Sequence, residues 1–202
     1  TSLAEKILST EGGAAVQTLS DAGRAVLVRR ALEELQDNVH YYHRHRRSAA
    51  FCQMAAQTID ELKSAGLSGQ QLAQLAGACG AESGKLSELA LIFQGYETLL
   101  ARSGMDPSDR LELAGARLEE ALARHSLPEF LRDRAVFIDE FDTFNAPKKR
   151  LLGAMLAALP SVTVAPCDDG APLLPGDLSL FSGAKQVAAQ LRQLARKNGA
   201  EV

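Results

Sequence analysis

Two adjacent acids, Asp139 and Glu140, directly follow the short apolar run AVFI. The β-branched and aromatic residues of this run favour a fully buried strand of a parallel sheet. Parallel sheets bind ligands at the carboxyl ends of their strands, so the acids match a Walker B element, in which an aspartate holds Mg²⁺ and the next glutamate orients the attacking water. The alternative interpretation is a buried strand that ends in acids simply because it meets water.

A nucleotide hydrolase also needs a phosphate loop of the form GxxxxGK[ST], and the sequence contains none. The nearest approach, GAESGKLS, contains Gly80, Gly84 and Lys85, but it follows no predicted strand and lies between two predicted helices. We interpret it as a helix–helix connection. This chain by itself is therefore expected not to hydrolyse ATP and to contain no catalytic residue that works in isolation.

The densest basic segment is HYYHRHRR, residues 40–47. Arginine can pair with phosphates and tyrosine can stack on unpaired bases, so this composition suits single-stranded nucleic acid. The candidate binding residues are Tyr41, Tyr42, Arg44, Arg46 and Arg47. Two other interpretations are a solvated corner between helices and a contact with an acidic protein partner. A metal site at His40, His43 and His45 is disfavoured, because the segment holds no Cys or carboxylate ligand.

A second, smaller basic cluster consists of Lys148, Lys149 and Arg150 at the predicted start of a helix. The helix dipole does not favour cations at that end. The cluster therefore either meets an anion or lies on a solvated face. For the first case, Lys148 and Lys149 are further candidates for contact with nucleic acid.

Composition limits the classes of function. The chain has 202 residues, of which 46% are hydrophobic and 23% charged, as in ordinary globular proteins. The net charge of -3 gives no general attraction to nucleic acid, so DNA binding must depend on a local patch. Cys52, Cys79 and Cys167 are odd in number and form no CxxC motif, which indicates reduced residues of a cytoplasmic protein. No apolar run reaches the roughly 18 residues of a membrane span, and no signal-peptide pattern is present.

Helical periodicity dominates residues 20–124. Ser20, Ser68 and Asp106 are predicted N-caps, and the apolar face of residues 51–66 includes Met54. Gly66 and Gly104 are predicted helix ends.

After residue 134 the pattern changes. Residues 135–139 and the run SVTVAP are predicted strands on either side of a helix capped by Asn145, which is a βαβ unit. A loop rich in Gly, Pro and Asp and an amphipathic helix follow. The predicted fold is mostly α with a small parallel α/β part.

Several segments occur in one order along the chain: LSDAGRAVLVRRALEE, FCQMAAQTIDELKSAGLS, KLSELALIFQGYETLLARSGMDPSDRLELAGARLEE, VFIDEFDTFNAPKKRLLGAML and SVTVAPCDD. Together with LFSGAKQVAAQLRQLARKNGA they resemble the AddB family over nearly the whole chain. These proteins are the B subunits of AddAB, an ATP-dependent helicase and exonuclease that processes double-strand DNA breaks for homologous recombination.

The resemblance implies a degenerate superfamily 1 helicase fold. Residues 1–128 would be a helical subdomain inserted in a partial RecA-like domain, residues 129–202, which holds the βαβ unit and the last helix. The implied partners are a single- or double-stranded DNA end and a motor and nuclease A subunit, with no membrane. The implied function is to bind and guide DNA, to scaffold the partner subunit and to help scan for a recombination hotspot.

The resemblance also implies that this chain is a piece of a longer parent. A phosphate loop would lie upstream of Thr1, and a nuclease domain with iron–sulfur cysteines downstream of Val202. ATP, an iron–sulfur cluster and a Mg²⁺ ion on Asp139 would then belong to the parent, and this fragment would hold no cofactor.

The family commonly has Asp-Gly-Phe where this chain has Asp139, Glu140 and Phe141. The difference indicates residual nucleotide binding or neutral drift. Phe141 and Phe144 are expected to be packing residues. The alternative functions are a fragment of an ATP-hydrolysing superfamily 1 helicase and a pure protein-interaction module.

Overall fold

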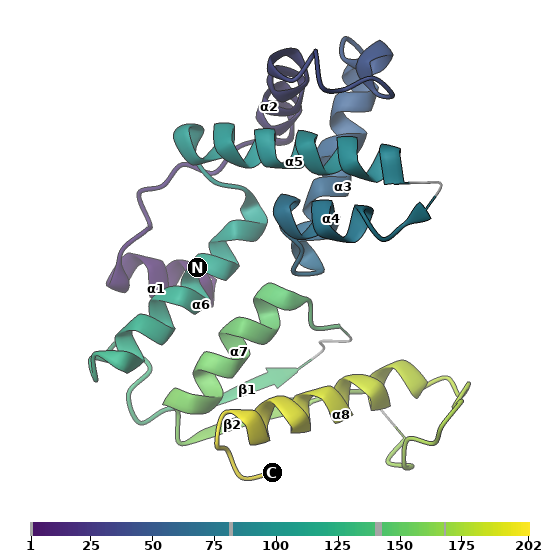
Figure 1. Cartoon of the computed structure of the whole chain (residues 1–202). Coiled ribbons are helices and arrows are strands. Elements are labelled where there is room, and N and C mark those ends of the chain that lie inside the picture. Colours follow the sequence, from purple (N-terminus) through teal and green to yellow (C-terminus); the bar gives the residue numbers. More distant parts are fainter. Residues whose placement is uncertain (1, 81–82, 140–142, 168) are drawn as a thin grey trace. The chain divides into compact units, whose positions relative to one another are not determined.

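The computed structural model describes residues 2–80, 83–139, 143–167 and 169–202. These residues form helices and one two-stranded parallel sheet (Figure 1), which confirms the mostly α fold with a small parallel α/β part. The elements in chain order are α1 (Leu3–Glu11), α2 (Asp21–Glu34), the 3₁₀ helix η1 (His43–His45), α3 (Ala49–Ser64), α4 (Gly69–Ala76), α5 (Ser83–Ser103), α6 (Pro107–Ala123), β1 (Ala135–Asp139), α7 (Ala146–Ala158), β2 (Ser161–Ala165) and α8 (Ser182–Lys197).

The chain divides into two compact units. We call residues 15–110 the helical unit, and residues 1–14 together with 111–202 the α/β unit. The domain limits expected from the sequence, 1–128 and 129–202, concern the domains of a parent protein and stay a prediction.

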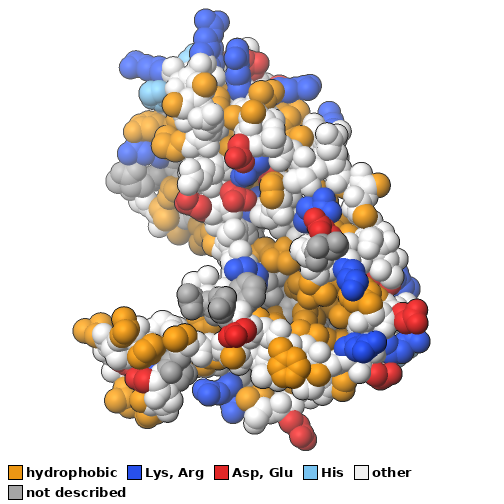
Figure 2. Space-filling view, turned by 180° about the vertical axis from the view of Figure 1, so that it is seen from behind, with side chains coloured by type: hydrophobic (Ala, Val, Ile, Leu, Met, Phe, Trp, Pro, Cys, Tyr) orange, Lys and Arg blue, Asp and Glu red, His pale blue; other side chains and the backbone are white. Residues whose placement is uncertain are grey.

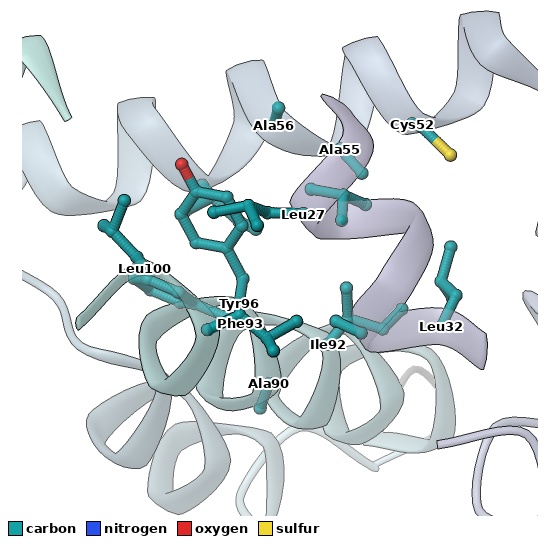
Figure 3. Close-up of a cluster of buried hydrophobic side chains, with 14 of the residues drawn as sticks. Leu27, Leu32, Cys52, Ala55, Ala56, Ala90, Ile92, Phe93, Tyr96 and Leu100 are labelled. Atoms are coloured by element: carbon teal, nitrogen blue, oxygen red, sulfur yellow. The ribbon is translucent and has the colours of Figure 1, made fainter. Parts of the chain in front are cut away.

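The core of the helical unit lies among α2, α3, α4 and α5. Figure 3 shows the Tyr96 side chain of α5 beside Leu27 of α2, and Phe93 and Ala56 belong to the same apolar cluster. Close packing of α4 on α5 depends on Gly69, because a Cβ there would lie 2.7 Å from Gln94 Cγ. Burial of these apolar side chains is the main stabilising contribution to the unit.

Local hydrogen bonds set the helix ends of this unit as predicted. The Ser20 and Ser68 hydroxyls accept backbone N–H groups at the starts of α2 and α4, which satisfies donors that have no partner inside a helix. Gly104, with φ +150°, donates to Leu100 O at the end of α5. One expectation is wrong: Met54 is 59% exposed, because the buried face of α3 runs through Cys52, Ala55, Ala56 and Ile59.

The α/β unit contains the predicted βαβ arrangement. Strands β1 and β2 run parallel, with Ala135 opposite Ser161 and Asp139 opposite Ala165, and Asn145 caps the connecting helix α7. Helix α1 joins this unit, where Ile7 packs in one apolar cluster with residues of α6 and α7. The sequence analysis missed α1, although its start carries the Ser2–Glu5 capping box.

The expected full burial of β1 is wrong. Residues of both strands alternate between exposed and half-buried, and Phe137 is 75% exposed. Val136 and Val162 pack against the apolar cluster of the unit, on the opposite face from Phe137. The physical reason is that, within the described residues, the sheet has two strands and the Phe137 face is uncovered.

Candidate nucleic-acid interface

The predicted basic segment forms the connection between α2 and α3. We call residues 40–47 the basic loop. Val39, directly before it, is 1% exposed and belongs to the core of the helical unit. Ser48, directly after it, caps α3 by accepting the N–H of Phe51. The loop is therefore fixed at both ends by packing and hydrogen bonding.

A carboxylate of α5 binds the start of the basic loop. Glu88 Oε1 accepts the N–H of His40 at 2.8 Å, both carboxylate oxygens accept the N–H of Tyr41 at 2.8 Å, and Oε2 accepts that of Tyr42 at 3.1 Å. Burial acts to raise the pKa of Glu88, but these N–H donors lower it, and the pKa lies below its usual range. Glu88 therefore stays ionised at neutral pH and holds the loop backbone to α5.

Aromatic contacts distinguish the packed rings of the basic loop from the exposed ring of Tyr41. The Tyr42 ring stacks on Phe51 at 5.4 Å between centroids, and the His45 ring stacks on Phe51 at 5.5 Å. Tyr41 meets Tyr42 edge to face at 5.0 Å and remains 54% exposed. Tyr42 therefore helps to fix the loop, whereas Tyr41 presents its ring at the surface.

One cation contacts the exposed Tyr41 ring, and the same loop exposes arginines. Lys85 of α5 places its Nζ 5.1 Å from the centroid of the Tyr41 ring, which is a cation–π geometry. Arg44 and Arg47 are exposed, and Arg46 is half-buried with its Nη1 2.7 Å from the His43 ring. Figure 2 shows Lys and Arg side chains beside histidine at this end of the helical unit, in the upper part of the view. A loop that carries an exposed aromatic ring, a cation on that ring and exposed arginines suits unpaired bases and phosphates.

Lys85 and Glu88 were not among the residues predicted to form this surface. Lys85 was noted only as part of the segment that resembles a phosphate loop. That segment was predicted to be a helix–helix connection, but in the structure its residues from Ser83 onward, with Lys85, form the first turns of α5. No local pattern in the sequence reveals that this turn meets the basic loop.

The histidines of the basic loop were weighed as metal ligands. Among the described residues, no three His, Cys, Asp or Glu side chains are grouped so that they could hold a metal ion. Cys52 is buried, Cys79 and Cys167 are exposed, and all of them are free thiols.

The second basic cluster makes contacts between helices of the α/β unit. Arg150 pairs with Glu112 and, at 2.6 Å, with Glu119, both on α6, and ion pairing with Glu119 and Glu112 raises the pKa of Arg150. Lys149 Nζ lies 2.8 Å from Gln190 Oε1 of α8, and Lys148 Nζ lies 3.4 Å from Thr143 O. The proposed contacts of Lys148 and Lys149 with nucleic acid stay a prediction.

Of the two acids predicted at the end of the first strand, the structure describes Asp139. Asp139 is the last residue of β1 and is exposed at the carboxyl end of the parallel strand. Its neighbours Glu140 and Phe141 lie outside the described residues, and Phe144 is half-buried. The structure confirms the strand, and the role of Asp139 in binding Mg²⁺ stays a prediction.

A buried polar network lies in the helical unit and was missed by the sequence analysis. Asp106, expected only as an N-cap of α6, is fully buried and accepts from the Tyr96 hydroxyl at 2.5 Å and from Lys63 Nζ at 2.8 Å. Arg24 Nε lies 3.5 Å from the same carboxylate. Burial, and next the bond to Asp106, raise the pKa of Tyr96. The network joins α2, α3, α5 and the start of α6.

A second buried cation fixes the loop between β2 and α8. Lys185 is 6% exposed, and its Nζ lies 3.0 Å from an Asp169 oxygen and 3.5 Å from Asp177 Oδ2. The same loop exposes apolar side chains, including Leu178 at 97% and Leu180 at 90%. Exposed apolar side chains mark surfaces that meet other proteins when they form a contiguous patch.

None of the helices in the described ranges is long and apolar enough to cross a membrane.

Comparison with known proteins extends over the whole chain. The family model described as "ADDB, N-terminal" matches residues 1–202. A protein of Desulforudis audaxviator, named as the B subunit of an ATP-dependent helicase/deoxyribonuclease, is 32% identical over 206 residues, which cover 99% of this chain and 17% of that protein. Proteins of the same name from Moorella thermoacetica and Heliobacterium modesticaldum are 31% and 30% identical over 98% of this chain, and 17% and 16% of their own lengths are covered. The chain thus spans about a sixth of the length of these relatives.

Proposed function

Because the chain belongs to the AddB N-terminal family, we propose that it is a helicase-like module of a DNA-repair complex, one that binds and guides a DNA strand. The observation that carries this proposal is the exposed Tyr41 ring in contact with Lys85, on a loop that also exposes Arg44 and Arg47. The relatives are named as subunits of an ATP-dependent helicase and deoxyribonuclease, whose substrate is DNA. A RecA-like parent domain and docking of a motor and nuclease A subunit are parts of the same proposal.

The chemistry of the basic loop fits an unpaired strand better than a duplex. The face of an aromatic ring can stack on any base that is not paired, and guanidinium groups can contact the phosphates on either side. Such binding does not depend on base sequence. It would hold a DNA strand while a partner motor moves along it.

We assign no catalytic step to this chain. Asp139 could supply one ligand to Mg²⁺ in a parent protein, but no further metal ligands are grouped around it within the described residues. The cysteines likewise form no group that fits an iron–sulfur cluster in that part of the chain. The activity that we propose for the module is binding.

A second candidate function, contact with a protein subunit, is favoured by the loop between β2 and α8. An ion pair between Lys185 and Asp169 holds that loop in place, and the loop exposes Leu178 and Leu180. This contact and the strand-binding surface involve different units of the chain. Both can therefore operate in one parent protein.

The basic loop is tested by replacing Arg44, Arg46 and Arg47 together with Ala. We expect affinity for a labelled single-stranded oligonucleotide to fall by about tenfold or more, because lost phosphate contacts are not replaced. The slope of log affinity against log salt should become shallower by about 2. Fluorescence anisotropy of the whole chain at several salt concentrations measures both quantities.

A matched control removes three other arginines of the helical unit. Arg29, Arg30 and Arg102 are exposed residues of α2 and α5. Their replacement with Ala makes the same change in net charge and should lower affinity much less. Equal losses in both triple variants, or no binding by the unaltered chain at low salt, would contradict a strand-binding role of the basic loop.

A further inference from the structure

A carboxylate lies within the surface that we assign to DNA. Glu88 is bound to the backbone of the basic loop, close to Tyr41. By Coulomb's law alone, a negative charge at this place weakens the attraction of a phosphate strand. Its position therefore calls for a structural reason.

The geometry of Glu88 supplies that reason. Its two oxygens accept the N–H groups of three successive residues, 40–42, at 2.8–3.1 Å. A carboxylate that accepts several backbone N–H groups makes charge-assisted hydrogen bonds, which are stronger than those between neutral groups. Glu88 belongs to α5, whose following turns are part of the core, so it ties the loop to a rigid element.

The exposed phenol ring of Tyr41 lies between two fixed points of the loop. Val39 is buried before it, and Tyr42 is stacked on Phe51 after it. Lys85 lies one turn before Glu88 on the same helix and contacts the Tyr41 ring. One face of α5 thus holds the loop backbone through an acid and places a cation on the ring that the loop carries.

We propose that Glu88 is a positioning residue for single-strand binding: it fixes the backbone of residues 40–42 so that the Tyr41 ring is held ready for one unpaired base. Lys85 and Arg44 would then meet the phosphates next to that base. The inference rests on the proposed function and adds a stacking subsite and the residue that orders it. A loop ordered before binding loses less conformational entropy when the strand binds.

The test is whether Glu88→Gln weakens or strengthens the binding of single-stranded DNA. Gln keeps the size of the side chain but loses the charge and one acceptor oxygen. Electrostatics alone predicts tighter DNA binding after loss of a negative charge. Positioning predicts weaker binding, by about fivefold or more, because the loop is released. The matched control is Glu34→Gln, an exposed acid of α2 in the same unit, which should leave affinity unchanged or slightly increased.

A second measurement does not depend on DNA. In ¹H–¹⁵N spectra of the unaltered chain, amides 40–42 should resonate downfield and exchange slowly with solvent, as expected for N–H groups bound to a carboxylate. Both properties should be lost in Glu88→Gln while the amides of α2 and α3 keep their positions. Retained slow exchange of those helices shows that the variant is folded.

A double-mutant cycle with Tyr41→Ala links Glu88 to the ring. Tyr41→Ala alone should weaken binding by about tenfold, the effect of losing one stacked base. If Glu88 acts through Tyr41, the two losses do not add, and the double variant binds about as weakly as Tyr41→Ala.

The outcomes separate the two proposals. DNA binding by the unaltered chain together with unchanged or tighter binding by Glu88→Gln would overturn the positioning role alone. Additive losses in the cycle would do the same. A lack of DNA binding by the unaltered chain would overturn the proposed function and the positioning role with it. Weaker binding by Glu88→Gln, lost protection of amides 40–42 and a non-additive cycle would together support the role.

Discussion

Replacing Asp106 with Asn should lower the free energy of unfolding of the helical unit by about 3 kcal/mol or more. Asp106 is fully buried and neutralises Lys63 and Arg24, whose side chains are 14% and 10% exposed. Asn has nearly the same shape but carries no charge. The substitution therefore removes the fully buried counter-charge that Lys63 and Arg24 share, although Lys63 keeps Asp109 at 2.5 Å and Arg24 keeps Asp60 at 3.6 Å. It also weakens the bond from the Tyr96 hydroxyl.

Urea unfolding followed by tyrosine fluorescence measures this effect in the helical unit alone. The chain has no Trp, and its three tyrosines, Tyr41, Tyr42 and Tyr96, all lie within residues 15–110. The control is Asp60→Asn, because Asp60 is 38% exposed and lies 3.6 Å from the same Arg24. It should cost less than about 1 kcal/mol. If Asp106→Asn cost no more than this control, the network would not be a main support of the unit.

Replacing Ile7 with Ala should lower the free energy of unfolding of the α/β unit by about 2–5 kcal/mol. Ile7 of α1 is fully buried in an apolar cluster with Leu118 of α6 and Met155 of α7. Ala at this position leaves a cavity that the surrounding helices fill only in part. The effect would show that the first helix of the chain belongs to the core of this unit.

Hydrogen exchange of the α6 and α7 amides, combined with melting followed by far-ultraviolet circular dichroism, measures the effect of Ile7→Ala. Leu3→Ala is the control, since Leu3 lies on the same helix and is 36% exposed. It should change stability by well under about 1 kcal/mol, as is usual for surface substitutions. Unchanged exchange in Ile7→Ala would mean that α1 adds little to the packing of α6 and α7.

The helices of the chain could be predicted because their signals are local. Ser20, Ser68 and Asn145 cap helices through hydrogen bonds to residues three positions further on, which a sequence shows directly. The two strands were found for a similar reason, since short apolar runs on either side of a helix indicate a βαβ unit.

Features that depend on distant residues could not be predicted in this way. Asp106 has the sequence pattern of an N-cap, but its carboxylate is drawn into the core by Tyr96 and Lys63. The burial of β1 depends on how many strands lie beside it, and this number cannot be predicted from the five residues of β1. Phe137 therefore fitted a buried strand by composition and is exposed in the structure.

The composition of residues 40–47 revealed the candidate site, but it did not show which of their side chains are exposed. A run of Arg and Tyr indicates a surface for nucleic acid whether or not each side chain is available. Only the fold separates the packed Tyr42 from the exposed Tyr41 and brings Lys85 and Glu88 to the basic loop. These two residues lie about 40 positions or more further along the chain than the loop residues they contact, beyond the reach of any local pattern.

The central claim is that the basic loop of the helical unit is the surface that meets a DNA strand. The most direct test is titration of the ¹⁵N-labelled chain with a short single-stranded oligonucleotide. We predict that the amides of residues 40–47 and of Lys85 shift most, and that the Tyr41 ring protons move upfield as a base stacks on them. Shifts confined to residues 111–202, or no shifts at low salt, would contradict the claim.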